Sequence, residues 1–91
     1  SLSSLERLYL YDNQLSGEIP RKLGSLSSLE RLYIQDNNLS GDVPESLLLL
    51  APDNGGSLDR LRAYNNDLIW DVNDKNIADQ LVNHGVDQVW V

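Results

Sequence analysis

The sequence predicts an α/β fold made of stacked repeat coils, closed at its C-terminal end by a helix and a strand. Two observations predict the stack. Residues 1–24 and 25–48 are identical at 16 of 24 positions, and a weaker third copy keeps their spacing of leucine and asparagine. A third observation predicts the closing elements, because the repeat pattern stops after Leu68 and gives way to helical and then extended patterns.

Five positions in each copy set the frame of the repeat. They are Leu5, Leu8, Leu10, Asn13 and Leu15, then Leu29, Leu32, Ile34, Asn37 and Leu39, then Leu58, Leu61, Ala63, Asn66 and Leu68. Successive copies lie 24 and then 29 residues apart, so five residues are inserted before the third copy. We place this insertion at residues 49–57, where proline, asparagine and glycine supply turn chemistry. We therefore expect about three coils in residues 1–70 and a capping helix and strand in residues 71–91.

Each coil is expected to begin with a short strand and to turn at an asparagine. Leu8 and Leu10 alternate with other residues, which is the periodicity of a strand with one buried face. The side-chain amide of Asn13 can bond backbone groups of its own coil and of the neighbouring coil. Since one coil cannot bury its own leucines, we expect Leu8, Leu32 and Leu61 to lie side by side in one interior.

The segment after the third coil reads as a short helix, within residues 71–85, followed by a final strand or extended tail. Suitable helix ends are Asn73 or Asp74 as N-cap and Gly85 as terminator. The residues expected on the buried face of the helix are Ile77, Leu81 and Val82. The tail is indicated by Val86, Val89 and Val91 together with Trp90. We expect Trp70 and Trp90 to cover the last coil rather than to bind a ligand.

Composition argues against several classes of function. A formal net charge of -7 disfavours nucleic acid and anionic membranes as partners. The chain has no cysteine, and its longest apolar run, Leu47 to Ala51, is far shorter than the ~18 residues of a membrane span. His84 is the only histidine, and no serine or paired carboxylate is placed to work with it. We therefore expect neither enzyme activity nor a cofactor.

Two local motifs could indicate a metal site and a glycosylation site, but each also has a structural explanation. Residues 71–76 are rich in oxygen ligands, as in a calcium loop, but lack the glycine at the sixth position and the distal glutamate of an EF-hand. Helix capping explains them better, so we expect no metal site. Asn38-Leu39-Ser40 is a glycosylation sequon, although the repeat itself produces this sequence, so its presence adds little independent support for a glycan on Asn38.

The motif LxxLxLxxNxLSGxIPxxLGxLxxL, which runs from Leu5 to Leu29, resembles the plant-type leucine-rich repeat of receptor-like kinase ectodomains and polygalacturonase inhibitors. The resemblance covers residues 1–68. It implies a curved solenoid with a short parallel sheet on the concave side, an extra strand from the LSGxIP region, and protein, peptide or carbohydrate-related ligands. A receptor-like parent would place the chain at the cell surface or outside the cell.

The chain departs from that family pattern in two ways. The extracellular members carry paired cysteines in their caps, and this chain has none. The third copy has Ala63 at a leucine position and Ile69-Trp70-Asp71 where Ser-Gly-x-Ile-Pro would stand. We interpret this copy as a terminal, capping coil.

If the leucines point inward, the residues between them point outward and stack in rows across the strands. The rows predicted from the register are Glu6, Glu30 and Asp59; Arg7, Arg31 and Arg60; Tyr9, Tyr33 and Arg62; Tyr11, Gln35 and Tyr64; and Asp12, Asp36 and Asn65. Tyrosine and arginine are enriched at interface hot spots. The residues predicted to contact a partner are Tyr9, Tyr11, Tyr33, Gln35, Tyr64, Arg7, Arg31, Arg60 and Arg62. Simpler explanations are that the charged rows neutralise one another and that tyrosine favours strands.

The function predicted from these residues is recognition of a protein or peptide on the outward strand face. The alternative is a structural one, in which the chain caps a longer solenoid and has no ligand of its own. Ser1 begins in full repeat phase without a polar cap, so we expect the first coil to expose leucines. That favours either a longer parent chain or self-association through the open end, and predicts a marginal or oligomeric isolated chain.

Overall fold

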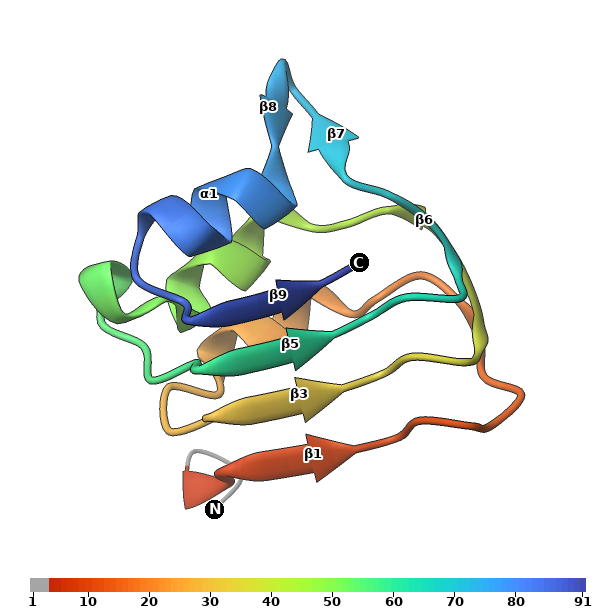
Figure 1. Ribbon diagram of the computed structural model, residues 1–91, viewed down its shortest axis with the longest axis horizontal. Coiled ribbons are helices and arrows are strands. Elements are labelled where there is room, and N and C mark those ends of the chain that lie inside the picture. Colours follow the sequence, from red (N-terminus) through yellow and green to blue (C-terminus); the bar gives the residue numbers. More distant parts are fainter. Residues whose placement is uncertain (1–3) are drawn as a thin grey trace.

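The structure, a computed structural model, describes residues 4–91 and is organised around a four-stranded parallel sheet. Its strands are β1 (Arg7–Tyr9), β3 (Arg31–Tyr33), β5 (Arg60–Arg62) and β9 (Gln88–Trp90), and they lie side by side in that order (Figure 1). Each of the first three comes from one repeat copy. This arrangement is compatible with the predicted solenoid. The expectation at Ser1 lies outside the described residues.

The leucines of successive coils share one interior, as predicted. Leu8 pairs with Leu32, and Leu32 pairs with Leu61, in the parallel register of the sheet. The side chains of Leu32 and Leu61 are fully buried, and Leu8 is half-buried at the edge of the same core. Because the side chains of a strand alternate between faces, this register directs the tyrosines and arginines to the opposite face of the sheet.

A second sheet is formed by β2 (Ser16–Gly17), β4 (Asn38–Asp42) and β6 (Asp67–Ile69), again parallel and in chain order. The first two strands are the extra strand that the resemblance implies for the LSGxIP region. The third forms although its coil lacks that motif. Extended backbone at this point is therefore imposed by pairing with the neighbouring coil.

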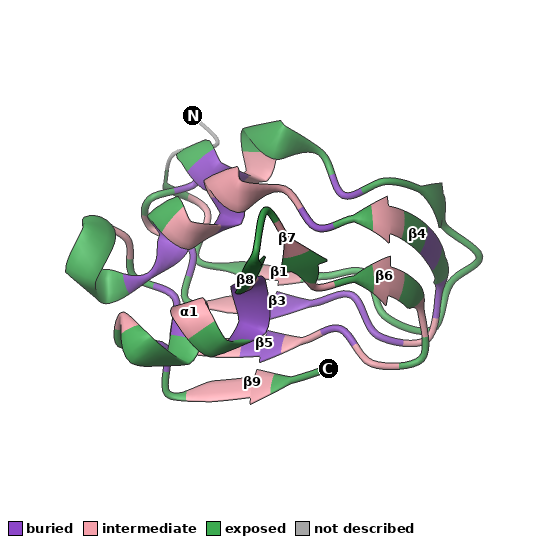
Figure 2. Ribbon diagram, turned by 90° about the horizontal axis from the view of Figure 1, so that it is seen from above, coloured by how far each residue is buried: buried purple, intermediate pink, exposed green. Residues whose placement is uncertain are grey.

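The chain returns from the second sheet through short 3₁₀-helices and, in the last coil, an α-helix. They are η2 (Arg21–Ser25), η3 (Glu45–Leu50), η4 (Pro52–Asn54) and α1 (Ile77–Asn83). Helix η4 lies in the segment predicted as the insertion. The buried residues come from the inner side of β3 and β5, from β4, from η3 and from the start of α1 (Figure 2).

The asparagines at the turn join consecutive coils, as predicted. The amide nitrogen of Asn37 donates to the carbonyl oxygens of Leu10, Ile34 and Gln35, at 2.9, 3.0 and 3.2 Å. Its oxygen accepts from the backbone N–H of Leu15 at 3.2 Å. Asn66 repeats this pattern in the third coil with Ile34, Ala63, Tyr64 and Leu39. Buried backbone groups at the turn are satisfied in this way.

The predicted start of the terminal helix is wrong. Strands β7 (Asp71–Val72) and β8 (Lys75–Asn76) form an antiparallel hairpin, and its two turn residues, Asn73 and Asp74, have φ of 52° and 63°. Paired left-handed residues are typical of a two-residue hairpin turn, and asparagine and aspartate tolerate them. The N-cap is Asn76 instead, whose side-chain oxygen accepts from the N–H of Asp79 at 3.0 Å.

The buried face of α1 also differs from the prediction. It consists of Ile77, Ala78 and Leu81, whereas Val82 is 51% exposed. The end of the helix is as predicted, since Gly85 has a φ of 107°. The N–H of Gly85 bonds the carbonyl oxygen of Val82, and that of Val86 bonds the carbonyl oxygen of Leu81. This pair of bonds is a Schellman motif, and it directs the chain into β9.

Candidate functional site

The outer face of the four-stranded sheet carries side chains in rows that cross the strands, as the repeat register predicts. We call this surface the ladder face. It consists of Arg7, Arg31, Arg60 and Gln88; Tyr9, Tyr33, Arg62 and Trp90; and Tyr11, Gln35 and Tyr64. All nine residues predicted to contact a partner lie in these rows.

The second row is a continuous stack of rings and one cation. The ring centroids of Tyr9 and Tyr33 lie 4.7 Å apart with an interplanar angle of 19°. The guanidinium carbon of Arg62 lies 4.5 Å from the ring centroid of Tyr33 and 5.6 Å from that of Trp90. The stack thus crosses all four strands. Cation–π contacts of this kind contribute about 0.5–1 kcal/mol each at exposed sites.

Trp90 is the residue of this face that sequence reasoning missed. It was expected to cover the last coil, but 53% of it is exposed and it stacks beside Arg62. Trp70 does pack against the core, as expected. The signal that could have revealed Trp90 is the motif Asp87-Gln88-Val89-Trp90, which aligns with Glu30-Arg31-Leu32-Tyr33 in charge, aliphatic position and aromatic position.

Two of the predicted contact residues are less accessible than expected. Tyr33 is 8% exposed because Tyr9 and Arg62 lie on its two sides. Gln35, in the middle of the third row, is 5% exposed, and its side-chain oxygen has no hydrogen-bond partner among residues 4–91. The interpretation of these two as open contact residues is therefore corrected. Tyr33 is thus covered by its own row neighbours.

The arginines of the ladder face are only partly neutralised. Arg60 lies 3.7 Å from the carboxylate of Asp59, but no carboxylate of residues 4–91 lies within 4.0 Å of Arg7, Arg31 or Arg62. The pKa of Arg31 is raised above its ordinary value, first by hydrogen bonding with the side chain of Tyr9. The carboxylate of Asp59 contacts Arg60, and its charge also contributes to the raised pKa of Arg31, so the expectation that the charged rows neutralise one another applies to these two arginines.

A shallow hollow of about 450 Å³ marks one end of the ladder face. Its lining residues are Tyr64, Val89, Trp90 and Val91. The hollow combines two aromatic side chains with aliphatic ones, and it adjoins Arg62, which stacks on one of those aromatic residues. Ligand sites are typically hollows of this composition beside a few polar groups.

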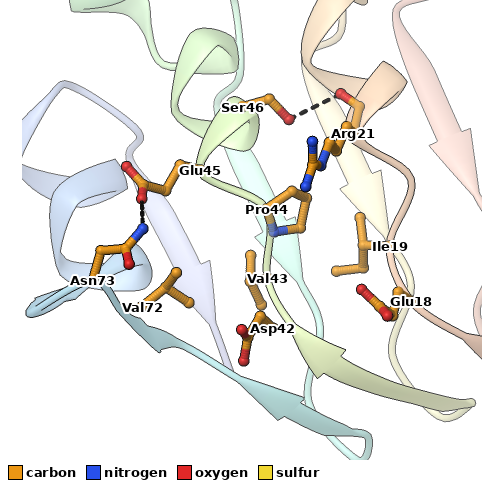
Figure 3. Close-up of a pocket in the computed structure, with 10 residues that line it drawn as sticks. All are labelled: Glu18, Ile19, Arg21, Asp42, Val43, Pro44, Glu45, Ser46, Val72 and Asn73. Carbon is orange, nitrogen blue, oxygen red and sulfur yellow. Dashed lines mark hydrogen bonds between the residues drawn. The ribbon is translucent and has the colours of Figure 1, made fainter.

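A second hollow of about 480 Å³ lies between the second sheet and the helices (Figure 3). Its apolar residues include Ile19, Val43 and Val72, one from each coil. Its polar rim is held by bonds between coils. The hydroxyl of Ser46 donates to the carbonyl oxygen of Arg21 at 2.9 Å. The amide of Asn73 donates to the carboxylate of Glu45, which Lys75 also contacts at 3.3 Å. Because these bonds join residues of different coils, the hollow lies along the seam, which is the line where neighbouring coils meet.

Other kinds of site are not assembled in the described part of the chain. Among residues 4–91, no group of three or more histidine, cysteine, aspartate or glutamate side chains could hold a metal ion. Among the oxygen-rich residues 71–76, the amide of Asn76 donates to Asp71 at 3.0 Å, and Asn73 and Lys75 bond Glu45. The Nδ1 of His84 lies 3.8 Å from the carboxylate of Asp53 at the surface. No helix in the described range has the length and apolar character needed to span a bilayer.

Comparison with protein families identifies the repeats. The family model described as leucine-rich repeats, in two copies, matches residues 3–48, which is half of the chain. No curated protein matches the chain. Leucine-rich repeats generally mediate protein–protein interaction. The matched region contains the first two coils, with the leucine register and the asparagine bonds described above. The chain therefore belongs to the leucine-rich repeat family.

Proposed function

We propose that the chain binds a protein or peptide on its ladder face and does so without catalysis. The observation that carries the proposal is the row in which Tyr9, Tyr33, Arg62 and Trp90 stack across all four strands. Tyrosine, tryptophan and arginine are the residue types that dominate interface energetics. Stacking fixes their conformations before binding, which lowers the entropic cost of association.

The accessible members of the face support a macromolecular partner rather than a small molecule. Tyr9 and Tyr11 are 43% and 48% exposed, and Trp90 is 53% exposed. These rings extend from one edge strand to the other, so a partner that contacts them all must span four strands at ~4.8 Å spacing. The shallow hollow beside Trp90 is too open to enclose a small ligand alone.

The finer parts of the proposal come from the sequence. The LSGxIP element favours the plant-type class of repeat, in which this sheet face would be the concave one. Both strands predicted from that element, β2 and β4, are present and support this assignment. In that class the ligand would be a protein, a peptide or a carbohydrate-related molecule, and a receptor-like parent would place the chain at the cell surface or outside the cell.

A second candidate function is favoured by the β1 end of the stack. Leu10 and Leu15 are 37% and 39% exposed there, and an apolar groove of about 230 Å³ runs between them and the second coil. At the opposite end α1 and β9 cover the core. In this alternative the chain joins further coils through β1 and acts as a structural cap. A Leu15→Glu variant would change its sedimentation coefficient only if copies associate through this end.

Selection from a displayed library of random peptides tests the proposed function. Binders are selected on the full chain and then measured on a Tyr9→Ala/Tyr11→Ala variant. Matched controls are Ile69→Ala and Val82→Ala, which remove apolar side chains of 49% and 51% exposure outside the ladder face. We expect the tyrosine variant to lose at least about tenfold in affinity, which is 1.4 kcal/mol, and the controls to bind like the wild type. Equal binding by all variants would contradict the proposal.

A further inference from the structure

Arg62 is held between two aromatic rings from neighbouring strands. Tyr33 precedes it in the row and Trp90 follows it, with 4.5 and 5.6 Å between the guanidinium carbon and the ring centroids. An exposed arginine ordinarily samples many rotamers, and ordering one costs up to about 2 kcal/mol. The flanking rings fix the guanidinium before any ligand arrives. Its fork of N–H donors is thereby preorganised.

Those donors have no acceptor within the protein. Among residues 4–91, no hydrogen bond or ion pair reaches the guanidinium of Arg62, although the chain contains 14 aspartates and glutamates. With rings on both sides, the N–H groups remain available only along the edge of the guanidinium. A planar, bidentate acceptor suits this edge best, and a carboxylate is such an acceptor.

Arg62 lies among the other arginines of the ladder face, of which Arg60 is paired with Asp59 at 3.7 Å. Arg60 lies on the same face of β5, and Arg31 lies on the adjacent strand in register with Arg60. These three and Arg7 are four of the seven lysines and arginines of the chain, all on one sheet. The hollow lined by Tyr64 and Trp90 adjoins Arg62 and can hold the aliphatic part of the side chain that carries the carboxylate.

From this geometry we propose that the ladder face selects partners that present an aspartate or glutamate side chain to the edge of Arg62. The inference rests on the proposed function, because it names the chemistry of a partner on the same face. Tyr33 and Trp90 are positioning residues here, since they orient the guanidinium. Arg31 and Arg60 attract the carboxylate at longer range, where the interaction is screened by salt.

The test uses a random peptide library fused through its C-termini, so that no free chain-end carboxylate is present. Peptides are selected on the full chain, and those that lose binding on Tyr9→Ala/Tyr11→Ala are kept as ladder-face binders. We expect an aspartate or glutamate to recur at one position of these peptides. The peptides are then synthesised with both ends blocked, with and without that acidic residue replaced by its amide.

A double-mutant cycle assigns the acidic residue to Arg62. On the wild type, replacing the peptide aspartate by asparagine should weaken binding about tenfold. On Arg62→Gln the same replacement should change affinity less than twofold. On the control variant Arg21→Gln, a cation outside the ladder face, the tenfold effect should persist. Arg62→Lys keeps the charge but loses the fork, and we expect it to retain only part of the effect.

Two results would overturn the inference and leave the proposed function standing. One is a set of ladder-face binders without a recurrent acidic residue. The other is a tenfold effect of the asparagine replacement that persists on Arg62→Gln. The first result needs no variant of Arg62, so a folding defect of Arg62→Gln does not obscure it. A selection that yields no ladder-face binders at all would contradict the proposed function and this inference together.

Discussion

The side-chain nitrogen of Asn37 lies 2.9 Å from the carbonyl oxygen of Leu10, and so one buried amide bonds the coil that precedes its own. The same amide bonds two carbonyl oxygens of its own turn. Backbone groups at such a turn are removed from water and must be paired inside the protein. The interface between coils is therefore polar at the turn and apolar in the middle, where Leu8 meets Leu32.

Replacing Asn37 by alanine should destabilise the fold strongly. Asn37 is 7% exposed, and its loss removes three hydrogen bonds to turn carbonyl oxygens and leaves the N–H of Leu15 without its acceptor. We expect a loss of about 3 kcal/mol in the free energy of unfolding, measured by urea denaturation. Asn13→Ala is the matched control, because Asn13 occupies the same repeat position but is exposed. We expect Asn13→Ala to lower the free energy of unfolding by less than about 1 kcal/mol. Equal losses for both would show that burial of the amide does not matter.

Close contact between the 3₁₀-helices of adjacent coils predicts a strict requirement for glycine at position 24. A Cβ added to Gly24 would lie 2.3 Å from the carbonyl oxygen of Ser46, which is backbone and cannot move alone. Gly24→Ala should therefore lower the free energy of unfolding, measured by urea denaturation, by about 3 kcal/mol. Gly55→Ala is the control, since Gly55 has a φ of 92° but open space around it. Backbone strain alone should cost about 1 kcal/mol there. A Gly24→Ala variant as stable as Gly55→Ala would contradict the packing of η2 on η3.

Much of the fold follows from the 24-residue period. That period, with five residues inserted before the third copy, places Leu8, Leu32 and Leu61 in one register, and the register in turn places the tyrosines on the other face. The C-terminal segment did not follow from the sequence, because asparagine and aspartate suit both helix caps and left-handed hairpin turns. Asn73 and Asp74 form the turn of the hairpin, because β7 pairs with β8 and this pairing excludes a further helical turn at the start of α1.

The sequence predicted the rows of the ladder face, but it did not predict that the second row continues onto β9. The spacing identified Tyr9, Tyr33 and Arg62 as one row, which the structure confirms. It did not identify Trp90, because β9 carries valine and tryptophan rather than the leucine pattern and follows a helix instead of a repeat. Side-chain exposure could not be predicted from the sequence either, since Gln35 is 5% exposed although its position in the register predicts an outward side chain.

The hairpin assignment predicts opposite responses to two substitutions at Asp74. Its φ of 63° lies in the left-handed region, which glycine occupies without strain and alanine does not. The free energy of unfolding of Asp74→Gly should therefore be about 1 kcal/mol higher than that of Asp74→Ala. If residue 74 instead lay inside a helix, alanine would exceed glycine in stability. Thermal or urea denaturation of the two variants distinguishes these cases.

The contact between Glu45 and the hairpin predicts a pH-dependent contribution to stability. A hydrogen bond from Asn73, and then one from Lys75 with its charge, lower the pKa of Glu45 below its ordinary value. A carboxylate whose pKa is lowered on folding stabilises the folded state above its unfolded pKa, and this contribution is lost as the pH falls through the folded pKa. Glu45→Gln should therefore lower the urea midpoint at pH 7. The difference from wild type should shrink as the pH falls below the unfolded value of about 4.5 and vanish once the pH is below the folded pKa. A difference that does not change with pH would assign the effect to packing.

The central claim is that a partner binds on the rows of the four-stranded sheet. The most direct measurement is an NMR titration of the isotope-labelled chain with a peptide selected on it, followed through the backbone amides and the two tryptophan side chains. We expect the largest shift changes at Tyr9, Arg62 and Trp90, in strands β1, β5 and β9, with little change in η2 and η3. Shift changes confined to the helices or to the seam around Glu45, with an unchanged Trp90 indole, would contradict the claim.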